Sequence, residues 1–323
     1  MKVFVAGASG VIGRPLVRQL VAAGHDVVGM TSREEGPGVI EQAGASAVVA
    51  DALDADAVRE SVGAARPEVI VNELTKLPRD YDTRKLDERF YGPTNRIRTV
   101  GGGNLLAAAA AAGARRFVTQ SIAFLYAPEG EMVKDEDGRP STDAPPPFGD
   151  GVRAMISHER AVLETEDMQG LVLRYGWFYG PGTYYAADGS IAEMVRKRRF
   201  PIMSGSDGLF SFVHIEDAAA ATVVACERGE AGVYNIVDDE PATIAEWLPA
   251  YAAALGAKRP WRVPGFIGRL FGGTAARMTI GLRGASNAKA RRDLGWEPRY
   301  ATWRVGFREE SLAAATPPDL PVR

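Results

Sequence analysis

The first thirteen residues constrain the fold of this chain more than any other segment. They read MKVFVAGASGVIG: an apolar run from Val3 to Ala6 ends in Gly7, and Gly10 and Gly13 follow at intervals of three. A helical pattern, Arg14 to Ala23, comes next. Strand, glycine turn and helix in this order are what a dinucleotide-binding fingerprint requires. An ordinary strand–helix turn is the plainer alternative, and further signals along the chain weigh against it.

The glycines of this turn have separate physical tasks. Gly7 allows the tight turn after the strand, Gly10 leaves room for a pyrophosphate to approach the backbone, and Gly13 lets the helix lie close to the strand. The helix N-terminus then presents unpaired N–H groups to the phosphates. We therefore predict that the turn binds a dinucleotide through Gly7, Ser9, Gly10, Val11, Ile12 and Gly13.

Strand and helix patterns alternate through the first half of the chain. Short β-branched runs between helices are typical of parallel strands buried on both faces. Right-handed crossovers between such strands give a doubly wound sheet, so we predict an α/β Rossmann fold. The predicted strands are 3–6, 26–30, 47–50, 69–72, 117–120 and 171–174, and the long helices are 94–112 and one that begins near 152.

The pattern becomes less regular in the second half. We predict that residues 1–176 form an NADP-binding Rossmann domain, with a returning strand near 233–238. Residues 177–323 are predicted to form mainly a smaller, substrate-binding lobe. The proline-rich stretch 127–151 between two of the predicted elements is expected to be a long surface loop.

The charge balance and the cysteine usage exclude several classes of protein. The net charge of −3, from 38 basic and 41 acidic residues, gives no basic field for nucleic acid and no polybasic membrane anchor. No apolar segment is long enough to span a bilayer or to act as a signal peptide. A single cysteine, Cys226, excludes an intramolecular disulfide and fits a reducing compartment. We predict a cytoplasmic protein that acts on a small molecule and has no metal site.

Several motifs beyond the glycine turn occur in a recognisable order. Leu173-Arg174 precedes Phe178-Tyr179-Gly180-Pro181, segment 212–217 reads FVHIED, and Leu294-Gly295-Trp296 lies near the C-terminus. In this respect the chain resembles, over nearly its whole length, the extended short-chain dehydrogenases/reductases, also called the NAD-dependent epimerase/dehydratase family. The resemblance implies a nicotinamide cofactor and a homodimer formed through the two long helices, near 94–112 and 152–166.

The resemblance also implies further contacts to the cofactor. Asp51 and Ala52 follow the third predicted strand, where the family places an aspartate that hydrogen-bonds the adenine. Leu74 and Tyr175, at the ends of the fourth and sixth strands, complete the predicted cofactor contacts.

The end of the second strand bears on the choice between NAD(H) and NADP(H). An NAD-selective site usually has an acidic residue there, which would repel a 2′-phosphate. This chain has Thr31, Ser32 and Arg33 instead, and a guanidinium can pair with a phosphate in a bidentate way. We predict NADP(H) in preference to NAD(H). The alternative is that Arg33 points to solvent, beside Glu34 and Glu35.

The expected catalytic pair is missing. The resemblance implies a Tyr-x-x-x-Lys on the helix that begins near 152, with both side chains on one face. That helix contains no tyrosine. Depending on the register, Met155 or Ile156 takes the tyrosine position, and Glu159 or Arg160 takes the lysine position. Arg160 is a candidate for holding the ribose or a phosphate.

Other side chains are candidates for the missing proton donor. Ser121, at the end of the fifth strand, is the candidate serine of the usual triad, although the register equally permits Ile122 there. His158 lies on the helix in question and can titrate near neutral pH. Among the tyrosines near strand ends we prefer Tyr175, because it directly follows the sixth strand; the others are Tyr126, Tyr179, Tyr184 and Tyr185.

Three hypotheses of function follow. The first is an NADP(H)-dependent oxidoreductase acting on a carbonyl or alcohol with a displaced proton donor. The second is an epimerase, isomerase or lyase that keeps the nucleotide as a helper. The third is an NADP-sensing regulatory protein without turnover. Hydride transfer to a substrate separates the first from the third.

Overall fold

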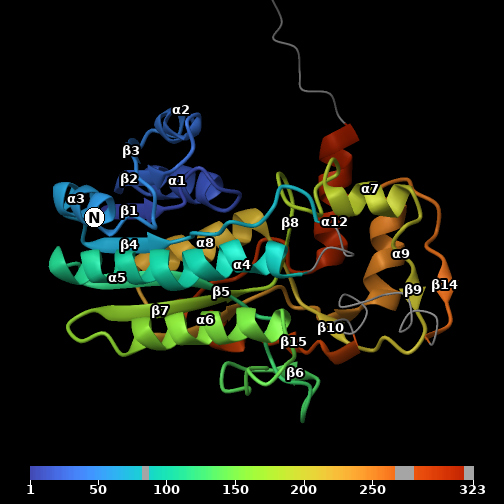
Figure 1. Ribbon diagram of the computed structural model, residues 1–323. Coiled ribbons are helices and arrows are strands. Elements are labelled where there is room, and N and C mark those ends of the chain that lie inside the picture. Colours follow the sequence, from blue (N-terminus) through green and yellow to red (C-terminus); the bar gives the residue numbers. More distant parts are fainter. Residues whose placement is uncertain (82–86, 266–279, 316–323) are drawn as a thin grey trace, which may run out of the picture.

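A seven-stranded sheet forms the centre of the molecule (Figure 1). The computed structural model describes residues 1–81, 87–265 and 280–315. The strands, in the order in which they pair, are β12 (Gly232–Ile236), β7 (Gln169–Tyr175), β5 (Arg116–Ile122), β4 (Val69–Asn72), β1 (Lys2–Ala6), β2 (Asp26–Thr31) and β3 (Ser46–Val49). Every pairing is parallel. The predicted α/β Rossmann fold is therefore confirmed.

Helices cover both faces of this sheet. They are α1 (Gly13–Ala22), α2 (Gly36–Gln42), α3 (Ala55–Ala65), α4 (Glu88–Arg96), α5 (Gly102–Ala111), α6 (Phe148–Leu163) and α8 (Ile215–Glu227). Because side chains alternate along a strand, each strand contributes residues to two separate hydrophobic cores, one on each face of the sheet. Val3 and Val5 pack with α1 and α8 on one face, whereas Phe4 and Ala6 pack with α3 and α5 on the other.

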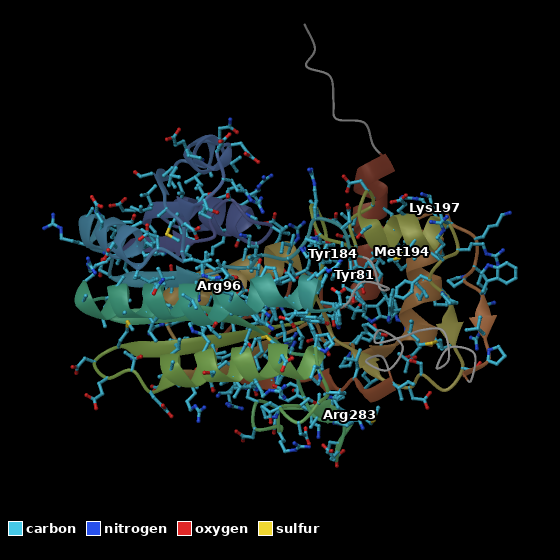
Figure 2. The ribbon with its side chains drawn as sticks, in the orientation of Figure 1. Tyr81, Arg96, Tyr184, Met194, Lys197 and Arg283 are labelled. Atoms are coloured by element: carbon cyan, nitrogen blue, oxygen red, sulfur yellow. The ribbon has the colours of Figure 1, made fainter. Side chains whose placement is uncertain are left out.

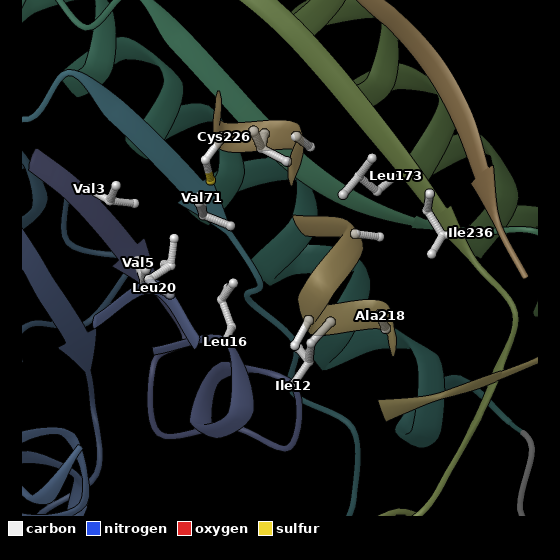
Figure 3. Packing of buried hydrophobic residues seen from close by; sticks show 14 of the residues in the cluster. Val3, Val5, Ile12, Leu16, Leu20, Val71, Leu173, Ala218, Cys226 and Ile236 are labelled. Atoms are coloured by element: carbon white, nitrogen blue, oxygen red, sulfur yellow. The ribbon is translucent and has the colours of Figure 1, made fainter. Parts of the chain in front are cut away.

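The core on the α1 and α8 face is continuous from the first strand to the last (Figure 3). Leu16 and Leu20 of α1 and Ala218 of α8 meet the sheet there, and Cys226 is 1% exposed within the same cluster. Burial raises the pKa of the Cys226 thiol. The single cysteine is thus a structural residue in an apolar environment.

The predicted helix 94–112 is part of a longer, interrupted rod. Helix α4 continues without a break into a π-helical turn, η1 (Ile97–Gly101), and then into α5. A π-helical turn widens the helix locally and frequently occurs at functional sites. Both α4 and η1 pack against α6.

A second core lies at the carboxyl end of the sheet. It contains parts of α7 (Ser190–Arg196), α9 (Ile244–Ala254) and α12 (Trp303–Ala315), which gather at one end of the molecule in Figure 1. Short strands connect it to the first core: β8 (Trp177–Tyr179) pairs with β11 (Phe212–His214), and β10 (Leu209–Phe210) pairs with β13 (Ala242–Thr243). Trp247 of α9 is fully buried at its centre.

The remaining elements lie at the periphery. Strand β9 (Ile202–Met203) pairs with β14 (Arg262–Val263), β6 (Val133–Lys134) pairs with β15 (Gly284–Ala285), and a second π-helical turn, η2, covers Ala290–Leu294. Within the three described segments, no helix has the length and apolarity needed to cross a membrane.

Candidate active site

The glycine turn between β1 and α1 is shaped by close backbone contacts. Gly7 has a φ of +87°, and its N–H donates to the carbonyl of Met30 at 3.1 Å. A Cβ on Gly7 would lie 2.7 Å from the carbonyl oxygen of Glu73, and a Cβ on Gly13 would lie 2.2 Å from that of Gly7. No residue larger than glycine fits either position without movement of the backbone.

The turn fits the diphosphate of a dinucleotide. Helix α1 has no side-chain cap and no acidic residue in its first turn. The N–H groups of Arg14 and Leu16 already donate to backbone carbonyls and Pro15 has none, so the N–H groups of Ile12 and Gly13 are the ones that can meet an anion. The turn lies between β1 and β4, where the strand order reverses, and ligands of doubly wound folds bind at that point.

The end of β2 is tied to the glycine turn by hydroxyl groups. Ser9 Oγ lies 2.7 Å from Thr31 Oγ1, which also accepts from the backbone N–H of Arg33 at 3.1 Å. Arg14 Nε donates to the carbonyl of Ser9 at 3.1 Å. Thr31 is buried and its hydroxyl is used internally, whereas Ser32 and Arg33 are exposed.

The other predicted cofactor residues lie on the loops after β3 and β4. Asp51 is exposed and accepts from the N–H of Leu53, while the carbonyl of Ala52 accepts from Asn104 at 2.9 Å. The backbone of Leu74 is held on both sides: its N–H donates to Asn72 and its carbonyl accepts from Gln120. These bonds order the carboxyl edge of the sheet, and the contacts to the adenine and nicotinamide stay predictions.

Helix α6 contributes Glu159 to a buried ion pair, at one of the two positions where the family resemblance implies a lysine. Glu159 accepts two hydrogen bonds from Arg174 of β7, at 2.6 and 3.1 Å, and both side chains are 5% exposed. Arg160 is exposed to solvent. The prediction that Arg160 holds the cofactor therefore finds no support in the geometry, because its neighbour Glu159 is the residue that α6 turns toward the sheet.

His158 is a buried, neutral residue of the core. Its Nε2 lies 3.1 Å from Asn72 Nδ2 and 3.1 Å from Thr119 Oγ1. Burial lowers the pKa of His158 to about 4, and the nearby charge of Arg98 acts in the same direction. The prediction that His158 titrates near neutral pH is wrong, because an imidazolium cannot be solvated in this position.

Tyr175 is also buried, on the sheet face that packs on α1 and α8. Only 1% of the residue is exposed, and its hydroxyl lies 3.0 Å from Glu73 Oε1 and 2.6 Å from Thr222 Oγ1. The phenol thus packs in the core, and the role of Tyr175 as a proton donor to substrate stays a prediction.

Glu73 is a buried carboxyl at the end of this chain of groups. The Tyr175 hydroxyl donates to Glu73 Oε1 at 3.0 Å, and Thr222 Oγ1, 2.6 Å from the phenol oxygen, donates to the carbonyl of Ala218. Burial raises the pKa of Glu73 to about 8, although the hydrogen bond from Tyr175 acts in the opposite direction.

The remaining candidate donors are also mostly enclosed. Ser121 is 1% exposed, and its Oγ has no hydrogen-bond partner in the described part of the chain. Tyr126 donates to Asn235 and receives a hydrogen bond from Arg174. Tyr179 and Tyr185 lie in the second core, and the half-buried Tyr184 donates to the carbonyl of Pro78. Figure 2 shows Tyr184 beside Tyr81, and their ring centroids are 5.3 Å apart.

Aromatic side chains line the carboxyl end of the sheet. Phe124, after β5, stacks on Trp177 of β8 with ring centroids 4.1 Å apart and planes at 14°. Phe210 follows at 5.7 Å from Trp177. Both Phe124 and Trp177 are half-buried, and Trp177 Nε1 has no acceptor among the described residues. The arrangement offers a planar, apolar surface to a ligand.

Comparison with known proteins identifies the family. A model of the family described as "NAD dependent epimerase/dehydratase family" matches residues 3–237. This chain belongs to the NAD-dependent epimerase/dehydratase family. The chain is accordingly an enzyme with a Rossmann fold that binds a nicotinamide dinucleotide.

Relatives within this family differ in reaction. A "3-diazoavenalumate denitrifying reductase" of Streptomyces is 45% identical over 312 residues, which cover 96% of this chain and all (100%) of the relative. A quinoline-oxide ketoreductase of Stigmatella aurantiaca is 24% identical over 80% of this chain and 74% of its own length. UDP-glucose 4-epimerase of Thermotoga maritima, solved with UDP-glucose, has a TM-score of 0.76 at 20% identity, covering 97% of this chain and 98% of that structure.

The sequence did not reveal the surroundings of several residues near the carboxyl end of the sheet. Glu73 directly follows the buried run Val69–Asn72, and an acidic residue at such a strand end was the available signal. Phe124 gave no signal, since it meets Trp177 only through the tertiary fold.

The protonated carboxyl of Glu73 makes a prediction about pH. The unfolded chain ionises Glu73 near its ordinary pKa, 4.5, whereas the folded chain holds the proton up to about pH 8, so the folded state binds more protons between these values. Stability contributed by this group is therefore lost as pH rises, by roughly 5 kcal/mol in total at 1.36 kcal/mol per pKa unit. E73Q should remove this component, measured by urea unfolding at several pH values.

The matched control is E60Q, at an exposed glutamate of α3. E60Q should leave the pH dependence of the wild-type protein intact. An E73Q variant whose unfolding free energy falls with pH as steeply as that of the wild type would contradict the assignment of a proton to Glu73.

Proposed function

We propose that this enzyme is an NADP(H)-dependent reductase that replaces the diazo group of an aromatic substrate by hydrogen. The carrying observation is that helix α6, FGDGVRAMISHERAVL, has neither tyrosine nor lysine beside an intact dinucleotide turn. The name of the relative that is 45% identical supports the reaction, since it describes a diazo compound, a loss of nitrogen and a reduction.

The reaction balances without an acid on α6. The glycine turn would hold a reduced dinucleotide, which would supply a hydride to the carbon that bears the diazonium group. The hydride's electron pair forms the new C–H bond, and the C–N bond breaks with its pair leaving in dinitrogen. No proton is consumed. Reduction of a carbonyl needs a proton as well as a hydride, and the groups first considered as its donor, Ser121, His158 and Tyr175, are buried in the core.

The residues of the chain bind, orient and exclude water in this proposal. The stacked rings of Phe124 and Trp177 hold the aromatic ring of the substrate against the carboxyl end of the sheet. A diazonium cation is attracted to the face of such rings. Residues 177–323, whose helices α7, α9 and α12 contribute to the second core, supply mainly the substrate lobe in this proposal. The homodimer through α4, α5 and α6 is part of the same proposal.

The test uses the diazonium derived from 3-amino-4-hydroxybenzoate and NADPH deuterated at the transferable position. We expect consumption of NADPH, release of dinitrogen and one deuterium on the product ring in place of the diazo group. A reaction without protein corrects for direct reduction. The result that overturns the proposal is reduction of an aryl ketone, such as an acetylbenzoate, with no turnover of the diazonium salt.

The preference for NADP(H) depends on Arg33. R33A should weaken the binding of NADPH by about tenfold or more, because one charge-assisted, bidentate contact to the 2′-phosphate is lost. NADH binding should be nearly unchanged. Titration by nicotinamide fluorescence measures both, with R59A, at another exposed arginine, as the control. Equal losses of affinity for NADPH and for NADH would contradict the assignment of Arg33 to the 2′-phosphate.

A further inference from the structure

Three polar side chains share one face of the rod formed by α4 and η1. Tyr91, Asn95 and Arg98 are spaced i, i+4 and i+7, and that face packs against α6. The opposing residue on α6 is Gly151: a Cβ there would lie 3.5 Å from Asn95 Oδ1 and 3.5 Å from Tyr91 Cδ1. Asn95 therefore faces a position at which α6 carries no side chain.

Arg98 places a positive charge in this interface without a counter-ion. Its Nε is buried and has no hydrogen-bond partner, and no ion pair to Arg98 occurs within residues 1–81, 87–265 and 280–315. Burial lowers the pKa of Arg98 to about 10, and the phenol of Tyr91 acts in the opposite direction. On α6 the nearby titratable group is His158, which is neutral and offers no compensation.

One polar atom of the neighbouring Asn95 is left unsatisfied. Asn95 Oδ1 is buried and has no donor in the described structure. Rotation of the amide exchanges Oδ1 for Nδ2, so that Asn95 can present a donor beside the guanidinium. Arg98 is half-buried, and its Nε is a buried donor without a partner, which an anionic ligand would satisfy.

We propose that Arg98, assisted by Asn95, binds the carboxylate of the substrate. A carboxylate matches the planar fork of a guanidinium. The phosphates of the dinucleotide are accounted for elsewhere, since the glycine turn leads into α1, which lies on the opposite face of the sheet from α5 and α6. The inference rests on the proposed function, in which the substrate is an aromatic acid, as the ending of the relative's name indicates.

The subsite has a consequence for substrate choice. In this proposal a carboxylate held by Arg98 and an aromatic ring placed on Trp177 would together orient the carbon that receives the hydride. The π-helical turn contributes because its wider backbone is where Arg98 projects from the rod. Arg98 is thus a specificity-determining residue.

The experiment compares trans-cinnamate with the neutral trans-cinnamamide as probes that bind without turnover. Both are titrated into the NADP+-loaded wild-type protein and into R98M, by calorimetry. We expect the wild type to bind cinnamate at least about tenfold more tightly than the amide, and R98M to bind both about equally. The affinity for NADP+ should be the same in both proteins.

The control is R96M, because Arg96 lies two residues away on the same rod and is exposed (Figure 2). R96M should keep the preference for cinnamate. R98K keeps the charge without the fork and should retain a reduced preference, which decides the matter if R98M does not fold. An unchanged preference in the Arg98 variants overturns the subsite.

Two further outcomes separate this inference from others. Loss of NADP+ affinity with an intact preference for cinnamate would make Arg98 a cofactor ligand and would overturn the proposal. A protein that prefers cinnamate through Arg98 but does not remove the diazo group would overturn the proposed function and leave the carboxylate subsite supported.

Discussion

Replacing Glu159 by alanine should destabilise the fold by about 3–5 kcal/mol, because it leaves a buried guanidinium without its partner. Arg174 donates two hydrogen bonds to Glu159, and both side chains are 5% exposed. The remaining contacts of Arg174, to Tyr126 and to the carbonyl of Glu136, are neutral and cannot replace the carboxylate. Urea unfolding of E159A against the wild type measures the loss.

The surface ion pair of Glu193 and Lys197 provides the matched control. It has the same charges at i, i+4 spacing on α7, with both side chains more than half exposed, so E193A should leave the free energy of unfolding nearly unchanged. The double variant E159M/R174M should be much closer to the wild type than E159A, because it leaves no unpaired charge. Equal losses in E159A and E193A would contradict the role of burial.

Substituting Gly7 by alanine should abolish dinucleotide binding or weaken it by more than about tenfold. The added Cβ would lie 2.7 Å from the carbonyl oxygen of Glu73, so the loop after β4 must move away from the turn. The φ of +87° adds strain that any residue other than glycine suffers. Fluorescence titration with NADPH reports the binding, and thermal unfolding reports the stability.

A substitution at Gly24 distinguishes the two causes, which are the close contact with Glu73 and the strain of a positive φ. The φ of Gly24, +82°, is nearly that of Gly7, but a Cβ there would meet nothing within 4 Å. G24A should therefore destabilise the protein by about 1–2 kcal/mol through backbone strain alone and leave NADPH affinity unchanged. If G24A impaired NADPH binding as strongly as G7A, the close approach of Glu73 would not be the cause.

The architecture could be predicted because its signals are local. Val69–Asn72 is predicted and observed with the same bounds, since four buried residues between two turns leave little choice. Strand β5 extends two residues beyond the predicted end, through Ser121 and Ile122, because those residues pair with Arg174 and Tyr175 of β7. The rod from α4 to α5 departs from one regular helix because a π-helical turn has no distinct signature in composition.

The residues of the candidate site could be predicted only where a short sequence motif identifies them. The glycine turn is such a motif, and its geometry agrees with its interpretation. The environments of the donor candidates could not be predicted, because they arise from distant segments: Tyr175 meets Glu73 across 102 positions, and His158 meets Asn72 across 86. Because side chains alternate along a strand, Tyr175 lies on the same face of the sheet as Leu173, and this face packs on α8. The alternation was a signal in the sequence that Tyr175 is buried.

The chain from Glu73 through Tyr175 and Thr222 to Ala218 links three parts of the fold by hydrogen bonds between buried groups. Glu73 belongs to the loop after β4 that meets the glycine turn, Tyr175 ends β7, and Thr222 and Ala218 lie on α8. A change in the position of the glycine turn therefore meets β7 and α8 through polar contacts as well as through the apolar core.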